Sequence, residues 1–427
     1  MMTNPFTLST TLTIALGITC LSSSITAQVY NVLDYGAVGD GKTMDTKAIR
    51  ATFAAMYQDT NGNGGTIYFP AGYTFLTSAM NITSNNTLML VDGKIQGVLD
   101  NTDYNLVDFL LWYGPDDSVA NTSDWREYEP FIGSWYINNI TIAGTGTIDM
   151  GGTAAGWWSC ASNVNLPPCN GHPRPHGIRL LGGDTIEIRD VTIQNSPMWT
   201  VHIGMCNNVW IHDAKILAPS GSHNTDGIDI DCSSNVLIEN TFISNGDDCV
   251  CMKSGKNWFG RTFGKPTQNV IVRNCVFGTG HGITVGSEMS AGVYNVTFEN
   301  IYANGTGTGV RLKSERGRGG LIKDIIYRNI TLDNIQGQAV QVTLNYANNL
   351  PPTNVTATPQ MENILVQDII ANSPIYGFFI DGLPESIIKN LTFNNVTINN
   401  SKKSTFEQCD YSQGTCIDTN PGCPPCL

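Results

Sequence analysis

Three carboxylates and a histidine occur in mid-chain segments whose spacing could bring them together. Asp226 lies in SHNTDGIDID, Asp247 and Asp248 in NGDDCVCMKSG, and His281 in GTGHGITVGSE. Crowded carboxylates repel one another, so one can keep its proton near neutral pH while others are ionised. Glycoside hydrolysis needs such a division, with one acid that protonates the leaving oxygen and one base for the nucleophile. His281 could tune these groups or relay protons.

Two cations follow at a similar spacing. Arg311 and Lys313 lie in GVRLKSERGRGG and are separated by one residue, so on a strand they share a face. Such a pair can hold a carboxylate, with arginine in a bidentate grip and lysine as a point charge. Each of these residues alone would more commonly be an ordinary turn or surface residue. We therefore base the prediction of a site on their matching positions in successive repeats.

The elements that must position these residues form a repeat between about residues 139 and 400. Asn or Asp opens each unit, a strand with alternating apolar residues follows, and a turn leads to another strand, as in NNVWIHDAKIL, SNVLIENTFI and QNVIVRNCVF. Units of this length predict a solenoid or a propeller. The Trp–Asp signature of propeller blades and the regular leucines of leucine-rich repeats are absent from the sequence. Short Val/Ile strands between Asn/Gly turns favour a right-handed parallel β-helix.

In that fold the candidate residues stack into one line. The separations are 21 residues from Asp226 to Asp247, 33 from Asp248 to His281 and 30 from His281 to Arg311, each about one coil. Four coils cover about 14 Å, or roughly three sugar units. We interpret Asp229 and Asp231 as structural or turn carboxylates.

The N-terminal part predicts a cover for the solenoid. Residues 46–56 have helical periodicity, with Asp45 or Thr46 as N-cap, and we expect this helix to close the open end. GGTIYFPAG at 64–72 is the expected first coil. GDGKT at 39–43 lacks the full spacing of a phosphate loop, so nucleotide binding is not predicted.

Composition excludes several classes of protein. The chain has 427 residues, a formal net charge of −13, 14% charged and 41% hydrophobic residues, and 44 glycines. The apolar content argues against disorder, and the negative charge argues against general nucleic-acid binding and a basic membrane surface. A polyanionic substrate would then need local positive charge, for which Arg311, Lys313, Arg316 and Arg318 are the candidates. We expect a monomer.

The N-terminus predicts secretion. The apolar run at 10–21 is too short for a membrane span and is followed by small residues, which is typical of a signal peptide cleaved near Ala27, although no Lys or Arg precedes it. We expect a signal peptide at 1–27, a β-helix catalytic domain at 28–400 and a Cys-rich tail at 401–427. Eleven Asn-x-Ser/Thr sequons are present, and we expect fewer than half to carry glycans.

Twelve cysteines suggest disulfides in an oxidising compartment. We predict a bridge between Cys249 and Cys275, on adjacent coils, and offer Cys206–Cys232 and Cys160–Cys169 as weaker pairings. The four tail cysteines could form a zinc knuckle, but disulfides are the preferred interpretation. Eleven cysteines remain after signal removal, so at least one is left over.

The ordered set NTD, DD, GHG and R-x-K resembles the polygalacturonases of glycoside hydrolase family 28, and GWWSC, NSPMWTVHI and SERGRGG extend the resemblance over about 29–400. It implies a parallel β-helix and inverting hydrolysis of α-1,4 bonds between galacturonates in pectin. It implies Asp247 as general acid, Asp226 with Asp248 as the pair that activates water, and His281 as an essential neighbour. It implies that Arg311 and Lys313 bind a carboxylate of the substrate, and that Tyr346 also contacts the substrate. We expect no metal and no cofactor.

Alternatives remain open at this point. Gly246 stands where many endo-acting members have Gln, and SEMSAGV and SERGRGG look more like exo-acting members, so exo action is favoured. Rhamnogalacturonan hydrolases share the fold, but usually differ at the second Asp and at R-x-K. A calcium-dependent pectate lyase needs metal carboxylates and an Arg or Lys base. A wall-binding β-helix needs no intact set of acid, base and clamp.

Overall fold

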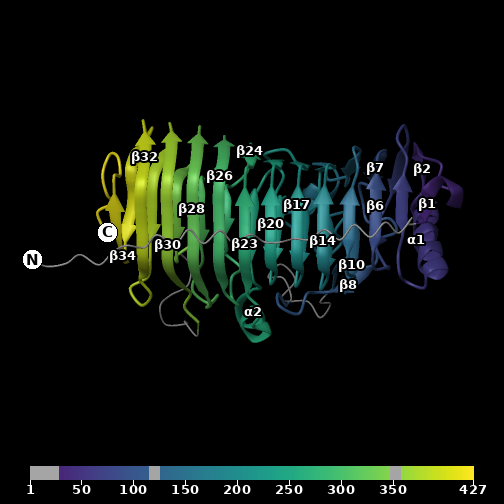
Figure 1. Cartoon of the computed structure of the whole chain (residues 1–427), viewed down its shortest axis with the longest axis horizontal. Coiled ribbons are helices and arrows are strands. Elements are labelled where there is room, and N and C mark those ends of the chain that lie inside the picture. The colour runs from purple at the N-terminus through teal and green to yellow at the C-terminus, as the bar shows by residue number, and fades with distance from the viewer. Residues whose placement is uncertain (1–27, 115–125, 347–356) are drawn as a thin grey trace, which may run out of the picture.

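The computed structural model describes residues 28–114, 126–346 and 357–427, so the expected signal peptide at 1–27 lies outside the described residues. The chain winds into a solenoid in which each strand pairs in parallel with strands of the neighbouring coils (Figure 1). This architecture confirms the predicted right-handed parallel β-helix. No helix in the described ranges is long and apolar enough to cross a membrane.

Two long sheets form the walls of the solenoid in the described part of the chain. The wide sheet comprises β1 (Val29–Asn31), β2 (Asp40–Met44), β3 (Thr66–Phe69), β4 (Thr74–Thr77), β6 (Thr87–Val91), β7 (Lys94–Gly97), β11 (Ile140–Ala143), β12 (Thr147–Asp149), β14 (Asp184–Arg189), β15 (Thr192–Gln194), β17 (Asn207–His212), β18 (Lys215–Leu217), β20 (Ser234–Glu239), β21 (Phe242–Ser244), β23 (Thr267–Arg273), β24 (Val276–Phe277), β26 (Val293–Asn304), β28 (Leu321–Asp333), β30 (Gln360–Asn372), β32 (Ile388–Asn399) and β34 (Ser412–Ile417).

The second wall, which we call the site sheet, comprises β5 (Met80–Asn81), β10 (Ile132–Trp135), β13 (Ile178–Leu181), β16 (Val201–Gly204), β19 (Ile228–Asp231), β22 (Val250–Lys253), β25 (Ile283–Val285), β27 (Val310–Lys313), β29 (Gln338–Thr343), β31 (Tyr376–Asp381) and β33 (Ser404–Asp410). An antiparallel pair lies outside both walls, β8 (Leu106–Asp108) with β9 (Arg126–Tyr128). The helical elements are η1 (Val32–Tyr35), α1 (Thr46–Thr60), η2 (Trp157–Cys160) and α2 (Asn257–Phe263).

The interior of the solenoid is a stack of aliphatic and aromatic side chains in register. Along the wide sheet each inward position meets its equivalent one coil away, which buries the apolar half of every strand. One such row is Ile186, Val209, Val236, Val270, Val296, Ile325, Ile364 and Leu391. This row fixes the register, because a slip of one residue would turn the apolar set outward.

Asparagines at the turns form a second stack, which we call the asparagine ladder. Asn235, Asn269 and Asn295 have φ of 57°, 56° and 52°, a left-handed conformation that asparagine tolerates well. The Asn269 amide donates to Asn235 at 3.2 Å, and that of Asn295 donates to Asn269 at 2.9 Å. The side chains therefore continue the hydrogen bonding of the backbone from coil to coil.

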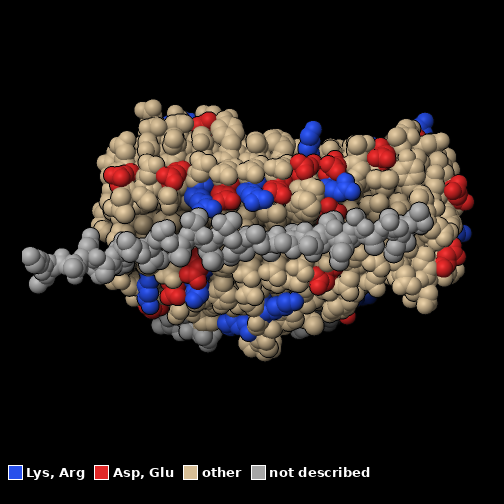
Figure 2. Space-filling model, viewed as in Figure 1, with Lys and Arg blue, Asp and Glu red and all other residues tan. Residues whose placement is uncertain are grey.

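The outer face of the wide sheet carries alternating charges. Glu239, Arg273, Glu299 and Arg328 occupy one register position on successive coils. Arg273 Nε lies 2.8 Å from Glu239, and Arg328 pairs with Glu299. Acidic and basic side chains correspondingly adjoin one another in a band across this face (Figure 2). These charges largely neutralise each other.

Helix α1 covers the N-terminal end of the solenoid, as predicted, and extends to Thr60 rather than ending at residue 56 (Figure 1). Its buried face, Ile49, Phe53 and Met56, joins the core. Asp45 occupies the N-cap position, but its carboxylate accepts from the backbone amides of Val38 and Gly39 rather than capping the helix. β1 already pairs with β3, so stacking begins before the predicted first coil at 64–72.

At the other end, the expected Cys-rich tail continues the stack. β33 pairs with β31 and β34 with β32, so the coils do not end at residue 400. Disulfides Cys409–Cys426 and Cys416–Cys423 tie this last coil to the segment that follows it. The preferred disulfide interpretation of the tail is confirmed.

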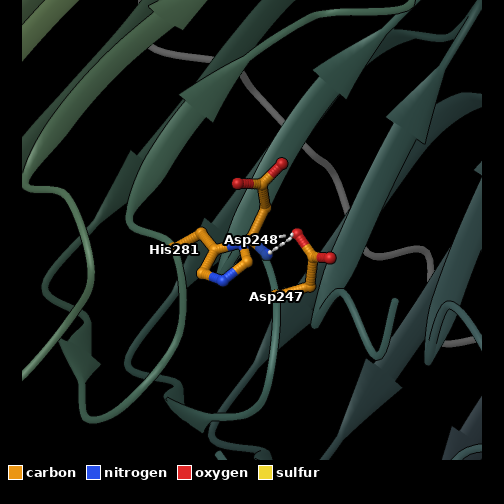
Figure 3. A group of neighbouring side chains, drawn as sticks. All are labelled: Asp247, Asp248 and His281. Atoms are coloured by element: carbon orange, nitrogen blue, oxygen red, sulfur yellow. Dashed lines mark hydrogen bonds and ion pairs between the residues drawn. The ribbon is translucent and has the colours of Figure 1, made fainter. Parts of the chain in front are cut away.

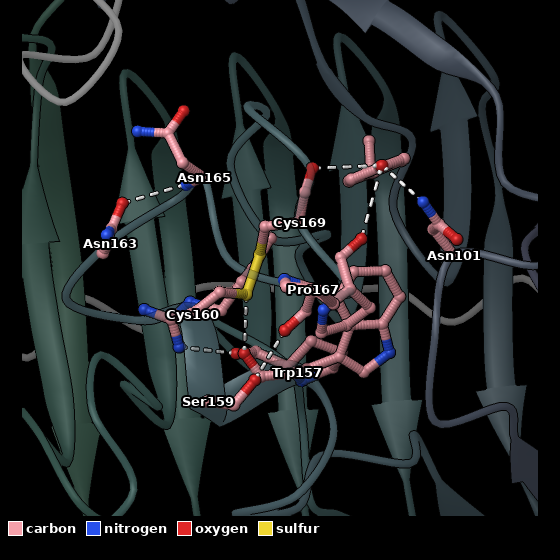
Figure 4. Close-up of a disulfide and its surroundings, with 12 residues drawn as sticks. Asn101, Trp157, Ser159, Cys160, Asn163, Asn165, Pro167 and Cys169 are labelled. Atoms are coloured by element: carbon pink, nitrogen blue, oxygen red, sulfur yellow. Dashed lines mark hydrogen bonds between the residues drawn. A yellow bond between two sulfur atoms is a disulfide. The ribbon is translucent and has the colours of Figure 1, made fainter.

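The third disulfide, Cys160–Cys169, was a weaker prediction and is present (Figure 4). The predicted Cys249–Cys275 bridge is wrong, because both cysteines are free and buried. Cys249 enters the site sheet just before β22, whereas Cys275 lies between β23 and β24 of the wide sheet. The two residues are on adjacent coils, but at different places around the perimeter.

The Cys206–Cys232 pairing is also wrong. β16 and β19 align Gly204 with Asp231, and the Cys206 backbone amide donates to Ser233, so Cys206 and Cys232 are one residue out of register. Successive residues of a strand point to opposite faces. Cys206 accordingly lies in the main core, while Cys232 packs outside it against Trp112.

Candidate active site

The outward face of the site sheet supplies the floor of the site. Inward residues of β19, β22 and β27 are aliphatic or Met and belong to the core, while the alternate residues face outward. Strand pairing aligns one outward row, which runs Arg179, His202, Asp229, Cys251, Thr284, Arg311 and Gln341. A neighbouring outward row contains Asp231, Lys253 and Lys313. Polar side chains on a buried sheet face indicate a functional surface.

Asp247, Asp248 and His281 come together at the turns that lead into β22 and β25. Asp247 Oδ1 lies 2.9 Å from His281 Nδ1 and accepts the Asp248 backbone amide at 2.8 Å. The backbone amide of His281 donates to the Asp247 carbonyl at 2.6 Å, which joins the two coils. The two neighbouring carboxylates leave the chain in different directions (Figure 3). The predicted stacking therefore holds for these three residues.

Asp248 is enclosed by cations. Its Oδ1 accepts from Arg311 at 3.0 Å and from Thr284 at 2.9 Å, and its Oδ2 accepts from Lys313 at 2.8 Å. Burial alone would raise the pKa of this carboxyl, but Lys313 and Arg311 lower it below its ordinary value. Asp248 is therefore ionised throughout the pH range in which proteins work.

Asp226 has the opposite environment. It lies in the turn before β19, and its carboxylate is 3.5 Å from Lys253 Nζ. Burial and the nearby charge of Asp247 raise the pKa of Asp226 to about 7, although Lys253 counteracts this. Two carboxylates of one site thus differ in charge over a wide range of pH, as the sequence analysis anticipated from crowding.

Asp229 and Asp231 belong to strand β19 rather than to a turn, which corrects one of the two interpretations. Asp231 is structural: it accepts from Trp112 Nε1 at 2.7 Å and lies 3.0 Å from His202 Nε2. Asp229 is part of the floor, fully buried, 3.4 Å from Lys253, and neither of its oxygens has a hydrogen-bond partner. Burial raises the pKa of Asp229 well above its ordinary value, and the neighbouring Asp226 carboxyl raises it further.

His281 is half exposed and borders the site on the solvent side. Its hydrogen bond with Asp247 raises the pKa of the imidazole above its ordinary value. The protonated ring is therefore favoured beside the Asp247 carboxylate. As pH rises through the pKa of His281 this positive charge is lost, so the dyad responds to pH close to neutrality.

Tyr346 lies beside the two cations. Its ring centroid is 5.4 Å from the Arg311 guanidinium carbon and 5.1 Å from Lys313 Nζ, and its hydroxyl accepts from Arg311 at 3.4 Å. The exposed ring forms one side of the site next to Asp248. These contacts have the geometry of cation–π interactions.

The expected basic lining is smaller than the sequence suggested. Arg316 pairs with Glu385 and Arg318 with Glu315 at 2.6 Å. The positive charge that faces the site comes from Arg311, Lys313 and Lys253, and each of these is engaged with an acidic residue of the floor.

Sequence reasoning missed Lys253 and Glu288. Lys253 Nζ donates to Glu288 Oε2 at 3.3 Å and lies 4.3 Å from the centre of the Trp199 ring. Burial alone would raise the pKa of Glu288, but Lys253 and Arg318 lower it, so Glu288 is ionised. A lysine at the end of the otherwise uncharged strand VCMK was the available signal.

Among the described residues, one acidic group could hold a cation: Asp247, Asp248 and His281, with donor atoms within 4.8 Å of one another. Both oxygens of Asp248 already accept from Arg311, Lys313 and Thr284, which leaves one carboxylate and one imidazole. Catalytic zinc sites have three protein ligands, and calcium takes six to eight oxygens. The donor set fits neither ion.

A wall closes the N-terminal side of the site. Phe109, Leu110 and Tyr113 line a cavity of ≈ 90 Å³ together with Trp199 and His202. The Tyr113 ring packs edge-on against Trp199 at 5.8 Å. Lys256 and Glu288 complete the lining on the side of the catalytic residues. The site is therefore a pocket on this side.

Comparisons with known proteins show which family the chain resembles. The profile described as "Glycosyl hydrolases family 28" matches residues 116–418, and the profile "Rhamnogalacturonase A/epimerase, pectate lyase-like" matches residues 29–172. A "Probable polygalacturonase" of Vitis vinifera is 33% identical over 389 residues, which cover 89% of this chain and 76% of that protein. The polygalacturonase of Prunus persica is 28% identical over 404 residues and 90% of each chain.

Solved structures share the fold. An exopolygalacturonase from Thermotoga maritima superimposes with a TM-score of 0.79 at 24% identity, over 92% of this chain and 91% of that chain. A family 28 exopolygalacturonase from Yersinia enterocolitica gives a TM-score of 0.76 at 22% identity, over 93% and 76%. At these identities the likeness concerns the β-helix alone.

Proposed function

This chain belongs to the glycosyl hydrolases family 28 and is a glycoside hydrolase of the polygalacturonase type, and on that premise we propose that it hydrolyses α-1,4 bonds between galacturonates at chain ends of pectin, with inversion. One observation carries the proposal. Asp226, Asp247 and Asp248 come from two neighbouring coils and have different surroundings: the pKa of Asp226 is raised, that of Asp248 is lowered, and Asp247 is the most exposed of the three. Acid and base roles require this difference.

Exposure favours Asp247 as the general acid. Its side chain is 18% exposed, against 1% for Asp248 and 4% for Asp226, so it is the carboxyl best able to reach a glycosidic oxygen. The hydrogen bond with His281 gives it a partner that can exchange a proton. Before reaction the imidazolium faces the Asp247 carboxylate, so the proton for the leaving oxygen comes from His281. His281 passes its proton to Asp247 as Asp247 protonates the leaving oxygen, which leaves a neutral imidazole and a carboxylate.

The deeper carboxylates activate water. Asp248, held ionised by Arg311 and Lys313, is the base that accepts the proton of an attacking water. Asp226 shares that water, and it serves as a second acceptor once it is ionised. Because the pKa of Asp226 is raised to about 7, kcat/KM should rise as pH increases toward neutrality.

The closed N-terminal side supports action at chain ends. Phe109, Leu110 and Tyr113 stand across the coils that precede Asp226, where an internal stretch of polymer would have to continue. A polymer that continued past Asp226 in this direction would meet the wall, whereas a chain end would not need to cross it. The rest of the bound polymer therefore extends from the site toward β27 and β29, where Arg311, Lys313 and Tyr346 lie.

Rhamnogalacturonan is the second candidate substrate, favoured by the profile match at residues 29–172. That match covers α1 and the first coils, but none of the catalytic residues. The R-x-K pair and both carboxylates at 247–248 are present, so polygalacturonate remains the preferred substrate. We further propose that the protein is secreted and monomeric, and the three disulfides support an oxidising compartment.

Product analysis tests the proposal. Purified protein is incubated with polygalacturonate, and with rhamnogalacturonan in parallel, and products are separated by anion-exchange chromatography. We expect monogalacturonate from the first time points, with a slow fall in viscosity, and the β-anomer as the initial product by proton NMR. A ladder of oligomers would overturn exo action. Unsaturated products that disappear with a chelator would overturn hydrolysis.

A further inference from the structure

Lys253 stands where three carboxylates of the site meet. Its ammonium lies 3.5 Å from Asp226, 3.4 Å from Asp229 and 3.3 Å from Glu288. The three acids come from the turn before β19, from β19 itself and from the segment after β25. The Lys253 side chain is 4% exposed, so this charge is held inside the protein. A buried lysine among acids is a costly arrangement that needs an explanation.

Asp226 depends on this lysine. Among the described residues, Lys253 is the one group that the structure brings within 4 Å of the Asp226 carboxylate as an ion-pair partner. Asp248, by contrast, has Arg311, Lys313 and Thr284. The two water-activating carboxylates are thus fixed by separate cations, one set on each side of the site.

The groups around Lys253 restrict the position of its ammonium. The Trp199 ring lies 4.3 Å from Nζ, at a distance suited to a cation–π contact, and excludes water from that side. Glu288 accepts a hydrogen bond from the same ammonium. Burial alone would lower the pKa of Lys253, but the acidic groups around it raise that pKa, so the lysine stays charged.

Charges on several elements act on Asp226. Asp247 and Asp248 on the next coil oppose its ionisation, while Lys253 and Lys313 favour it. Asp229, three residues further along the chain in β19, and Glu288 lie 3.4 Å and 3.3 Å from the same lysine. The ionisation of Asp226 therefore depends on how the Lys253 ammonium is shared between Asp226, Asp229 and Glu288.

We propose that Lys253 is a positioning residue that orients the Asp226 carboxylate and promotes its ionisation, and that Glu288 limits this effect by competing for the same ammonium. The inference rests on the proposed function, because it assigns Asp226 a part in activating water. It predicts shifts of opposite sign. Loss of Lys253 makes Asp226 harder to ionise, whereas loss of the charge on Glu288 makes it easier.

The test compares pH profiles of kcat/KM on polygalacturonate. We expect Lys253→Met to move the acidic limb upward by about one pH unit and to lower kcat at least about tenfold at constant pH, with KM changed less than about threefold. Glu288→Gln is expected to move the same limb downward. Lys253→Arg, which keeps the charge, should restore most of the wild-type profile.

Lys215→Met is the matched control, because Lys215 is exposed on β18 of the opposite wall, and its profile should equal that of the wild type. If Lys253→Met is active and its limb is unmoved, or if Glu288→Gln shifts upward, the inference is wrong. Should Lys253→Met fail to fold, the direction of the Glu288→Gln shift still decides. Inactivity of the wild type on polygalacturonate would instead refute the proposed function.

Discussion

Replacing Lys313 by Met tests how the site holds the buried Asp248 carboxylate. Methionine keeps the length and apolar contacts of lysine but carries no charge. In the structure Lys313 Nζ donates to Asp248 Oδ2 at 2.8 Å, and both side chains are buried. The substitution leaves Oδ2 without a partner, while Arg311 and Thr284 still bind Oδ1.

The expected magnitude follows from that geometry. Removing one partner of a buried ion pair costs ~3–5 kcal/mol. Because Asp248 retains Arg311 and Thr284, we expect the lower end, ~3 kcal/mol of the free energy of unfolding. The pKa of Asp248 is lowered in the folded state, so this stabilisation is complete above its ordinary value of ~4 and is lost as pH falls toward the folded-state pKa.

Urea denaturation at pH 6 and pH 2.5 measures this. Lys313→Met should lose ~3 kcal/mol of the free energy of unfolding at pH 6 and only ~1 kcal/mol at pH 2.5, where most of the linkage has been lost. Lys323→Met is the control, because its exposed pair with Asp324 at 3.7 Å should contribute below ~1 kcal/mol. In an Asp248→Asn background, Lys313→Met should cost far less than in the wild type. Equal losses at both pH values and in both backgrounds would refute the buried pair as the source of stability.

The same variant separates two roles for the cations. If they only organise Asp248, Lys313→Met lowers kcat/KM equally on polygalacturonate and on its methyl ester. If they also bind a galacturonate carboxylate, as the resemblance implied, the free polymer loses more. We expect an overall loss of about 100-fold on the free polymer and a smaller one on the ester. Equal losses would eliminate the carboxylate clamp.

Four further predictions concern single residues. Asp247→Asn should lower kcat by ~10²–10⁴-fold while substrate still binds, and a variant that keeps over about a tenth of the rate would contradict its role as acid. Asp226→Asn should stabilise the fold, because a pKa raised to about 7 makes the wild-type folded state lose stability as pH rises from ~4 to ~7. The free energies of unfolding of variant and wild type, measured in urea, should match near pH 4, and the variant should exceed the wild type by up to ~4 kcal/mol above pH 7. Asn269→Ala interrupts the asparagine ladder and should cost ~0.5–1.5 kcal/mol in the same assay, with no change in kcat. Alkylation in denaturant without reduction should label Cys249 and Cys275, and recovery of a bridged peptide would show the structure to be wrong there.

The site could be predicted because its residues follow the repeat. Asp226, Asp247, His281 and Arg311 sit at the turn or on the outward face of successive coils, so sequence spacing alone brought them into line. The fold followed from the same spacing. Tyr346 could be proposed only through the family resemblance, because its neighbours in the sequence do not show which way the ring points.

Other features needed the register of the strands. Lys253 is paired with Asp231 across β19 and β22, and the sequence does not state that alignment. The same limitation explains the failed disulfide predictions, because equal spacing shows that Cys249 and Cys275 are one coil apart, but not where each lies around the coil. The prediction of a separate tail at 401–427 rested on its cysteine content. Its structure is determined instead by the pairing of β33 with β31 and of β34 with β32.

The asparagine ladder has a consequence for the evolution of such an enzyme. Its rungs are 34 residues apart from Asn235 to Asn269, 26 from Asn269 to Asn295 and 39 from Asp324 to Asn363, yet each coil contributes one rung. The additional residues leave the coil elsewhere: α2 lies within the first of these intervals and directly follows Lys256, which lines the pocket. Insertions at the rim can therefore accumulate one coil at a time without altering the stack. The residues that determine specificity and the residues that maintain the stack lie on different sides of each turn, so the two sets can evolve independently.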